Sequence, residues 1–161
     1  MKRPVAIPTS SARARHAGFT LAELLVTMVI MLILAAIAYP AYTSFMTQAR
    51  RVEGQAALLD AMQQQERYYT QHQTYIAFSS ASTEAKAQQF RWWSGTVAAD
   101  SAYEISGREC PGIALDRCIE LRAEPGTAIV NASFRDPDCA TLVLTSAGDT
   151  YATGTSAKCW P

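Results

Sequence analysis

With 161 residues the chain has room for about one domain, and a second independent core is not expected. Its 14 Lys and Arg residues balance 14 Asp and Glu residues, so the overall charge does not indicate a nucleic-acid-binding protein. Lys2, Arg3, Arg13 and Arg15 all precede the first apolar segment, which leaves 10 basic and 14 acidic residues after it. The charge of about −4 on that remainder disfavours general attraction to polyanions.

The first predicted element is an apolar helix over residues 19–39, which read FTLAELLVTMVIMLILAAIAY. This length suits a helix that crosses a hydrocarbon core of roughly 30 Å. Glu23 is its only charged residue. The basic residues upstream predict, by the positive-inside rule, a cytoplasmic N-terminus and a C-terminal part outside the inner membrane.

A cleaved secretory signal is the alternative explanation of a basic flank followed by an apolar run. Such signals have an apolar region of about 7–15 residues and end at a small-residue cleavage site. Here the run is longer, no A-x-A motif closes it, and residues 40–42 lead into more helical sequence. A retained helix is therefore favoured.

Glu23 is costly in a membrane, because a carboxylate at the helix centre costs about 2.5–3.5 kcal/mol on insertion scales. One explanation is that the side chain reaches the interface from near the helix end. The functional explanation is a positively charged partner inside the membrane. A cut after Gly18 would create such a charge, the free amine of Phe19 on a neighbouring subunit.

Residues 18–25, GFTLAELL, resemble the class III signal of type IV prepilins and pseudopilins, and the likeness continues through LAAIAYPAY at residues 34–42. The resemblance implies that prepilin peptidase cleaves between Gly18 and Phe19 and methylates the new amine. It also implies that Glu23 pairs with the amine of an adjacent subunit during assembly. Pilins usually carry a glycine within this helix, where the chain has Met31-Leu32-Ile33, so the extent of helix melting near Pro40 stays open.

This resemblance predicts a structural subunit of a type IV pilus, a minor pilin, and no enzyme. Its expected partners are other pilin subunits, prepilin peptidase, an inner-membrane assembly platform and, before assembly, the membrane itself. The protein would span the inner membrane once and then reach the cell surface in the pilus. A pseudopilin of a type II secretion system shares the leader and is one alternative.

A DNA-uptake receptor is the other alternative, since some pilins with this leader bind DNA at the filament surface. Scattered solvated charges are the favoured explanation of the basic residues that would have to form one stripe. These residues are Arg108, Arg117, Arg122, Arg135 and Lys158.

Residues 43–72 are predicted to continue the helix as an amphipathic half that packs on a globular head. The three- and four-residue steps that carry this prediction are Val52, Ala56, Leu59, Met62, Glu66 and Tyr69. Gly54 is a weak point, costing about 1 kcal/mol relative to alanine. Arg50 and Arg51 are interpreted as a solvated face or a lipid headgroup contact.

Residues 73–161 are predicted to form the globular head, after a removed leader (1–18), a membrane and assembly helix (19–42) and its amphipathic continuation (43–72). Short strand-like runs at 103–106, 118–123, 128–134 and 141–145 are separated by turn residues. These turn residues are Gly107, Pro125-Gly126, Asp136-Pro137 and Gly148-Asp149. The result is an α+β fold, a long helix packed on an antiparallel sheet.

The four cysteines lie in the C-terminal third, and an even number in an exported domain indicates disulfides. Zinc is the rival explanation, but no C-x-x-C pair is present. The segment 138–148 with Cys159-Trp160 resembles the C-terminal region of PilE-like minor pilins, and this implies a loop closed by Cys139 and Cys159. Cys110 and Cys118 pair by default, although the sequence itself allows three connectivities.

No catalytic constellation, cofactor motif or metal motif stands out. Asp136 and Asp138 flank a proline in a predicted turn, where a calcium site is a minor alternative. His72 is the only histidine after Gly18, and no motif supplies it with triad partners. Trp92 and Trp93 are expected to be buried against the helix rather than to stack on a ligand.

Overall fold

The computed structural model describes residues 19–161, so the predicted leader and Gly18 lie outside the described part of the chain. Contacts divide the chain into unit 1, which ends at Ala41, and unit 2, Tyr42–Pro161. One helix, α1 (Leu21–His72), belongs to both units.

Unit 1 consists of the first half of α1, and its side chains are exposed throughout residues 19–41. An 18-residue window of this helix is long and apolar enough to cross a membrane. Thr20 precedes α1, and its hydroxyl accepts a hydrogen bond of 3.3 Å from the backbone N–H of Glu23. Ser or Thr followed three residues later by Glu is a common helix start. Pro40 lies inside α1 without ending it.

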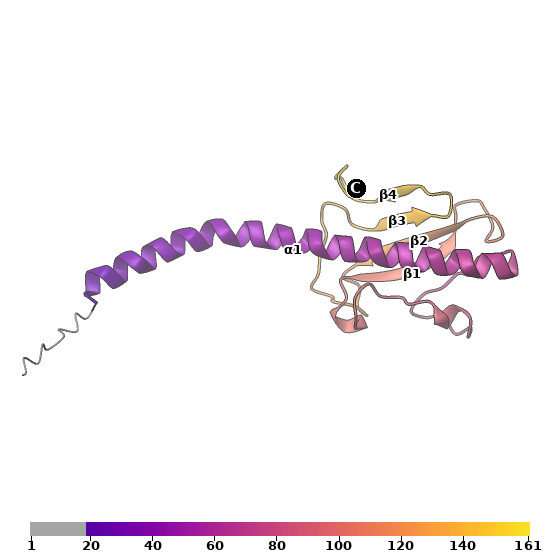
Figure 1. Cartoon of the computed structure of the whole chain (residues 1–161), viewed down its shortest axis with the longest axis horizontal. Helices are drawn as coiled ribbons and strands as arrows, with labels where there is room; N and C mark the ends of the chain where they lie inside the picture. Colours follow the sequence, from indigo (N-terminus) through magenta and orange to yellow (C-terminus); the bar gives the residue numbers. More distant parts are fainter. Residues whose placement is uncertain (1–18) are drawn as a thin grey trace, which may run out of the picture. The chain divides into compact units, whose positions relative to one another are not determined.

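Unit 2 contains a four-stranded antiparallel sheet in the order β1-β2-β3-β4, as Figure 1 shows. The strands are β1 (Tyr103–Glu109), β2 (Ile119–Pro125), β3 (Leu142–Thr145) and β4 (Thr150–Ala152). Two short 3-10 helices, η1 (Ala87–Gln89) and η2 (Ala98–Asp100), precede β1. The predicted α+β class with an antiparallel sheet is confirmed.

One predicted strand is wrong, and one strand of the sheet was not predicted. Residues 128–134 form turns, and their backbone groups are bonded within the segment, to Arg135 and to one distant residue, Ser101. The N–H of Asn131 bonds to the carbonyl of Ser101, and one nitrogen of Arg135 donates to the carbonyls of Ala132 and Phe134. The fourth strand is instead β4, whose three residues are too few for a period-two pattern.

Gly107 was predicted to be a turn residue but lies inside β1. It pairs through two backbone hydrogen bonds with Phe78, which closes the outer edge of β1. A Cβ atom at Gly107 would stand 2.7 Å from the Phe78 ring. Glycine is therefore required here for close approach rather than for a turn.

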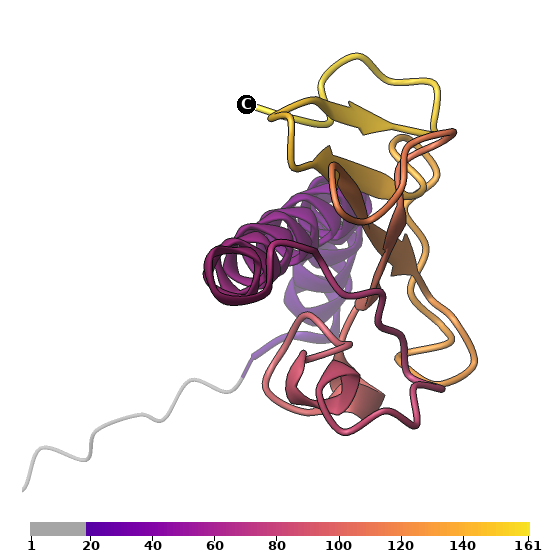
Figure 2. The same ribbon diagram turned by 90° about the vertical axis from the view of Figure 1, so that its right-hand side faces the viewer.

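The core of unit 2 lies between the second half of α1 and one face of the sheet (Figure 2). Burial largely alternates along β1 and β2, because every second side chain points toward the core under α1. Leu58 of α1 and Ile105 and Leu121 of the sheet are fully buried. The other face of the sheet carries the polar side chains.

The buried face of α1 matches the predicted one only in part, because Met62 and Tyr69 pack against the core and other predicted residues do not. Val52 and Leu59 remain 58% and 51% exposed. The buried residues of the helix are Gly54, Ala57, Leu58, Ala61 and Gln65. Three of these five residues are glycine or alanine, so small side chains contribute to this contact beside Leu58.

Gly54 and Gln65 show how this close contact is made. A Cβ atom at Gly54 would stand 2.8 Å from the ring of Tyr103. Gly54, which was expected only to weaken the helix, is therefore required for this packing. The Gln65 amide, fully buried, donates to the carbonyl of Ile76 at 2.8 Å and accepts from its N–H at 3.1 Å. The side chain thereby satisfies both backbone groups of Ile76, as a neighbouring strand would.

Replacing Gln65 by alanine is expected to destabilise unit 2 by at least about 2 kcal/mol, because both backbone groups of Ile76 lose their partner in a buried setting. Urea unfolding of the full chain in a non-ionic detergent, followed by tryptophan fluorescence, measures this change. The control is Gln64→Ala, one residue earlier and exposed, which is expected to change the free energy of unfolding by less than about 0.5 kcal/mol. Equal effects of the two substitutions would contradict this account of Gln65.

Candidate functional site

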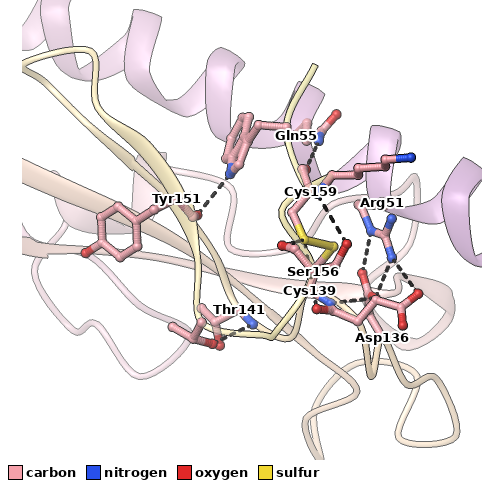
Figure 3. Close-up of a disulfide and its surroundings, with 12 residues drawn as sticks. Arg51, Gln55, Asp136, Cys139, Thr141, Tyr151, Ser156 and Cys159 are labelled. Atoms are coloured by element: carbon pink, nitrogen blue, oxygen red, sulfur yellow. Dashed lines mark hydrogen bonds and ion pairs between the residues drawn. A yellow bond between two sulfur atoms is a disulfide. The ribbon is translucent and has the colours of Figure 1, made fainter.

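The Asp136 carboxylate, whose side chain is fully buried, joins α1 to the loop before β3 (Figure 3). Arg51 of α1 donates from Nε and Nη2 to the two carboxylate oxygens, at 2.8 and 2.7 Å. Tyr103 of β1 donates its hydroxyl at 2.7 Å, and the backbone N–H of Cys139 donates at 3.2 Å. Four hydrogen bonds from three different segments therefore meet on one side chain.

These donors keep Asp136 ionised inside the protein. Burial by itself opposes the charge, but the hydrogen bonds from Arg51, Tyr103 and Cys139 outweigh it and hold the pKa of Asp136 below its ordinary value. Burial and the nearby carboxylate raise the pKa of the Tyr103 phenol, so it remains a donor. The Arg51 side chain is only 13% exposed. The interpretation of Arg51 as a solvated residue is wrong, and Asp136 is engaged by a guanidinium rather than free to hold calcium.

The C-terminal segment is fixed beside this cluster by the disulfide Cys139–Cys159. The carbonyl of Cys139 accepts from the N–H of Gly154, and the carbonyl of Asp138 accepts from the N–H of Ser156. Gln55 of α1 then donates to the carbonyl of Cys159 at 2.6 Å (Figure 3). The loop closed by the disulfide is thus bound to the same helix as Asp136.

The second disulfide, Cys110–Cys118, closes the connection between β1 and β2. Tyr69, near the end of α1, donates its hydroxyl to the carbonyl of Asp116, and the N–H of Tyr75 bonds to the carbonyl of Leu115. This loop is therefore tied to the end of α1. Both disulfides join the cysteines that were predicted to pair.

A second buried carboxylate, Glu120, lies on the face of the sheet that points away from α1. Its side chain is 1% exposed. Arg108 donates from Nε and Nη2 to Glu120 Oε1, at 3.0 and 2.8 Å, and Arg122 donates to the same oxygen at 3.2 Å. Tyr151 of β4 donates to Glu120 Oε2 at 2.7 Å. Burial opposes ionisation, yet these hydrogen bonds lower the pKa of Glu120.

Of the five basic residues considered for DNA, only Arg108 and Arg122 are brought together by a shared contact. Arg117 lies 3.9 Å from Asp116 on an exposed loop. The guanidinium of Arg135 is bonded to backbone carbonyls. Lys158 is exposed in the C-terminal segment beside Cys159.

The assembly residues predicted in the N-terminal segment are exposed in unit 1. Phe19 is 76% exposed, and the Glu23 carboxylate has no ion pair within residues 19–161. At the other end of α1, His72 is exposed and stacks on Tyr68, with 4.1 Å between the ring centroids. No cluster of three or more His, Cys, Asp or Glu residues suited to a metal occurs in the described range.

The two tryptophans lie beside the sheet. Trp92 and Trp93 are both half-buried and meet edge to face, with ring centroids 5.1 Å apart. Trp93 pairs through its backbone with Glu104 of β1.

An apolar N-terminal helix followed by a helix-covered, disulfide-linked antiparallel sheet is the arrangement of a type IV pilin. Residues 13–39 match the model of the prokaryotic N-terminal methylation motif. Residues 40–143 match the family model described as type IV minor pilin ComP, DNA uptake sequence receptor. This second match covers more than half of the chain, and the chain therefore belongs to the ComP family of type IV minor pilins.

Among solved structures, the chain is similar to a type IV pilin from Shewanella oneidensis, at 23% sequence identity and a TM-score of 0.44. That similarity covers 71% of this chain and 98% of the other. A comparison with curated proteins gives no match. The family match fits the predicted minor pilin, and the methylation motif indicates processing by prepilin peptidase.

Sequence reasoning missed both carboxylate clusters. Glu120 and Arg122 stand two residues apart on a strand and so share a face, which a period-two reading of β2 could have shown. No local signal joins Arg51 to Asp136, which are 85 residues apart. Tyr103 likewise appeared only as the first residue of a strand.

Replacing Asp136 by asparagine is expected to destabilise unit 2 by about 3 kcal/mol, because Arg51 is left as a largely buried charge without its counterion. The pH dependence should change as well. A carboxyl whose pKa is lowered on folding stabilises the fold above its unfolded pKa of about 4, and this stabilisation is lost as the pH falls through the lower folded value. Urea unfolding between pH 7 and pH 2 measures both effects.

Asp138→Asn is the matched control, since Asp138 lies two residues further along, is 70% exposed and is 3.7 Å from Arg51. It is expected to change stability by less than about 1 kcal/mol. The wild type and this control should both lose stability in acid, and Asp136→Asn should lose less. An acid profile of Asp136→Asn as steep as that of the wild type would be evidence against the Asp136 assignment.

Proposed function

We propose that the mature protein begins at Phe19, after cleavage between Gly18 and Phe19, and that its methylated amine and Glu23 direct assembly into a type IV pilus. Three observations support this proposal. The methylation motif spans residues 13–39, the segment after Phe19 is an exposed apolar helix, and Glu23 is the only charged residue in it.

The Glu23 carboxylate carries the assembly mechanism. It is exposed in unit 1 and has no ion-pair partner in the part of the chain that the structure covers. In hydrocarbon an unpaired carboxylate is costly, so a neighbour that supplies a cation gains stability in addition to helix packing. The amine of Phe19 on an adjacent subunit is such a cation. The pair would fix the axial position of one subunit relative to the next.

Before assembly, residues 19–42 would span the inner membrane once with the N-terminus in the cytoplasm, and residues 43–161 would lie outside. The basic residues ahead of Phe19 support this orientation. The two disulfides of unit 2 also fit an oxidising compartment. Prepilin peptidase, an inner-membrane assembly platform and other pilin subunits are the partners that this route requires.

Replacing Glu23 by alanine is expected to leave membrane insertion intact and to reduce incorporation into filaments at least tenfold, because the subunit loses its charged contact with a neighbour. Immunoblots of membranes and of sheared filaments measure the two quantities. Intact-mass spectrometry establishes whether the variant still begins at a methylated Phe19, so that a processing defect is distinguished from an assembly defect.

Thr27→Ala, one turn further along the same exposed helix, is the control and should assemble normally. The hydroxyl of Thr27 donates to the carbonyl of Leu24 in its own helix. Normal amounts of correctly processed Glu23→Ala protein in sheared filaments would refute the role of the carboxylate.

DNA binding is a second candidate function, favoured by two observations. The matched family is described as a DNA uptake sequence receptor, and the structure brings Arg108 and Arg122 together on the outer face of the sheet. Unit 2 otherwise carries more acidic than basic residues, so a contact would depend on this local pair rather than on net charge. A minor pilin that binds DNA could do so while assembled, because α1 covers the opposite face of the sheet.

The full chain in a non-ionic detergent is expected to bind duplex DNA with an affinity that falls steeply with salt concentration, since phosphate contacts release counterions. Arg108→Ala with Arg122→Ala should weaken this binding about tenfold. The matched control is Arg50→Ala with Arg67→Ala, which removes the same charge from α1. Equal loss in the two double variants would contradict a specific role for the sheet arginines. Mobility shift across a salt series gives these affinities.

A further inference from the structure

The Glu120 cluster consists of Glu120, Arg108, Arg122 and Tyr151, and its two positive charges exceed the one negative charge of Glu120. Arg108 lies opposite Glu120 in the pairing of β1 with β2, and Arg122 is two residues from Glu120 on the same face. Both guanidinium groups donate to one carboxylate oxygen, so they are held close together. The Glu120 charge is thus shared by two positive charges, and these three residues carry a net charge of +1; Glu124 lies beyond Arg122 on the same face, on the side away from Glu120.

Most of the hydrogen-bonding capacity of the two arginines is left over. A guanidinium has five N–H donors. Arg108 uses two of its nitrogens and Arg122 one, in each case toward Glu120, and no other side-chain hydrogen bond of either group is found within residues 19–161. Their side chains are 56% and 24% exposed, so the remaining donors can reach a ligand in solvent.

Glu120 is itself fixed in place, which makes the pair rigid. It is buried, and the hydroxyl of Tyr151 from β4 holds its second oxygen. Two like charges that were free in solvent would move apart, but here the common oxygen keeps them together. Paired guanidinium groups in a fixed position are suited to the oxygens of a phosphate, which accept several charge-assisted hydrogen bonds at once.

We propose that Arg108 and Arg122 bind one phosphodiester group of the DNA backbone together, as a single site positioned by Glu120. This inference rests on the proposed DNA-binding function and adds that the two arginines act as one contact and not as two. Removing either arginine leaves the other neutralised by Glu120, so each single substitution abolishes the site.

A double-mutant cycle on the full chain in non-ionic detergent tests this site with a duplex DNA probe. Arg108→Ala, Arg122→Ala and the double variant, the last combined with Glu120→Gln so that no unpaired carboxylate remains, are each expected to lose about tenfold in affinity near 0.1 M salt. Each should also reduce the slope of log affinity against log salt by about 0.9, the value for one phosphate. Two independent contacts would instead give a hundredfold loss and about twice that change in slope for the double variant.

Folding of each variant is checked by tryptophan fluorescence and thermal unfolding. Should an alanine variant fail to fold, Arg108→Lys and Arg122→Lys keep a cation beside Glu120 but lose the planar fork, and the same non-additive cycle is expected. Additive losses overturn the shared site while leaving DNA binding intact. A wild-type chain that does not bind the probe overturns both the site and the DNA-binding function.

Discussion

The buried Asp136 carboxylate is the constraint on which the arrangement of unit 2 depends. A charge removed from water has to be compensated on all sides, and here the compensation comes from α1, β1 and the loop that carries Asp136. The ion pair therefore fixes the position of the helix along the sheet, which apolar packing alone specifies less strictly. Gly54, one turn from Arg51, lets the Tyr103 ring approach the helix and complete the cluster.

This constraint extends to the end of the chain. Cys139 both donates its N–H to Asp136 and forms the disulfide with Cys159, and Gln55 binds the carbonyl of Cys159 from α1. The C-terminal segment is thus held on the same helix by covalent and polar contacts together. Such a link resists separation of the helix from the sheet.

The two faces of the sheet differ in chemical character. The inner face is apolar and packs on the second half of α1, while the first half of α1 matches the N-terminal methylation motif. The outer face holds Glu120 with its two arginines and Tyr151. One carboxylate is buried on each side of the sheet: Asp136 joins α1 to β1, and Glu120 holds two arginines whose side chains stay partly exposed.

The sequence by itself determined what depends on local pattern. The apolar run after Phe19 predicted the exposed first half of α1, and the strand-like runs predicted the first part of β1, most of β2 and all of β3. Only the tertiary structure decided which face of α1 is buried, because small residues and Gln65 give no hydrophobic signal. It also replaced the predicted strand at 128–134 by turns and joined Arg51 to Asp136. These features arise from contacts between residues far apart in the chain, and no local pattern encodes them.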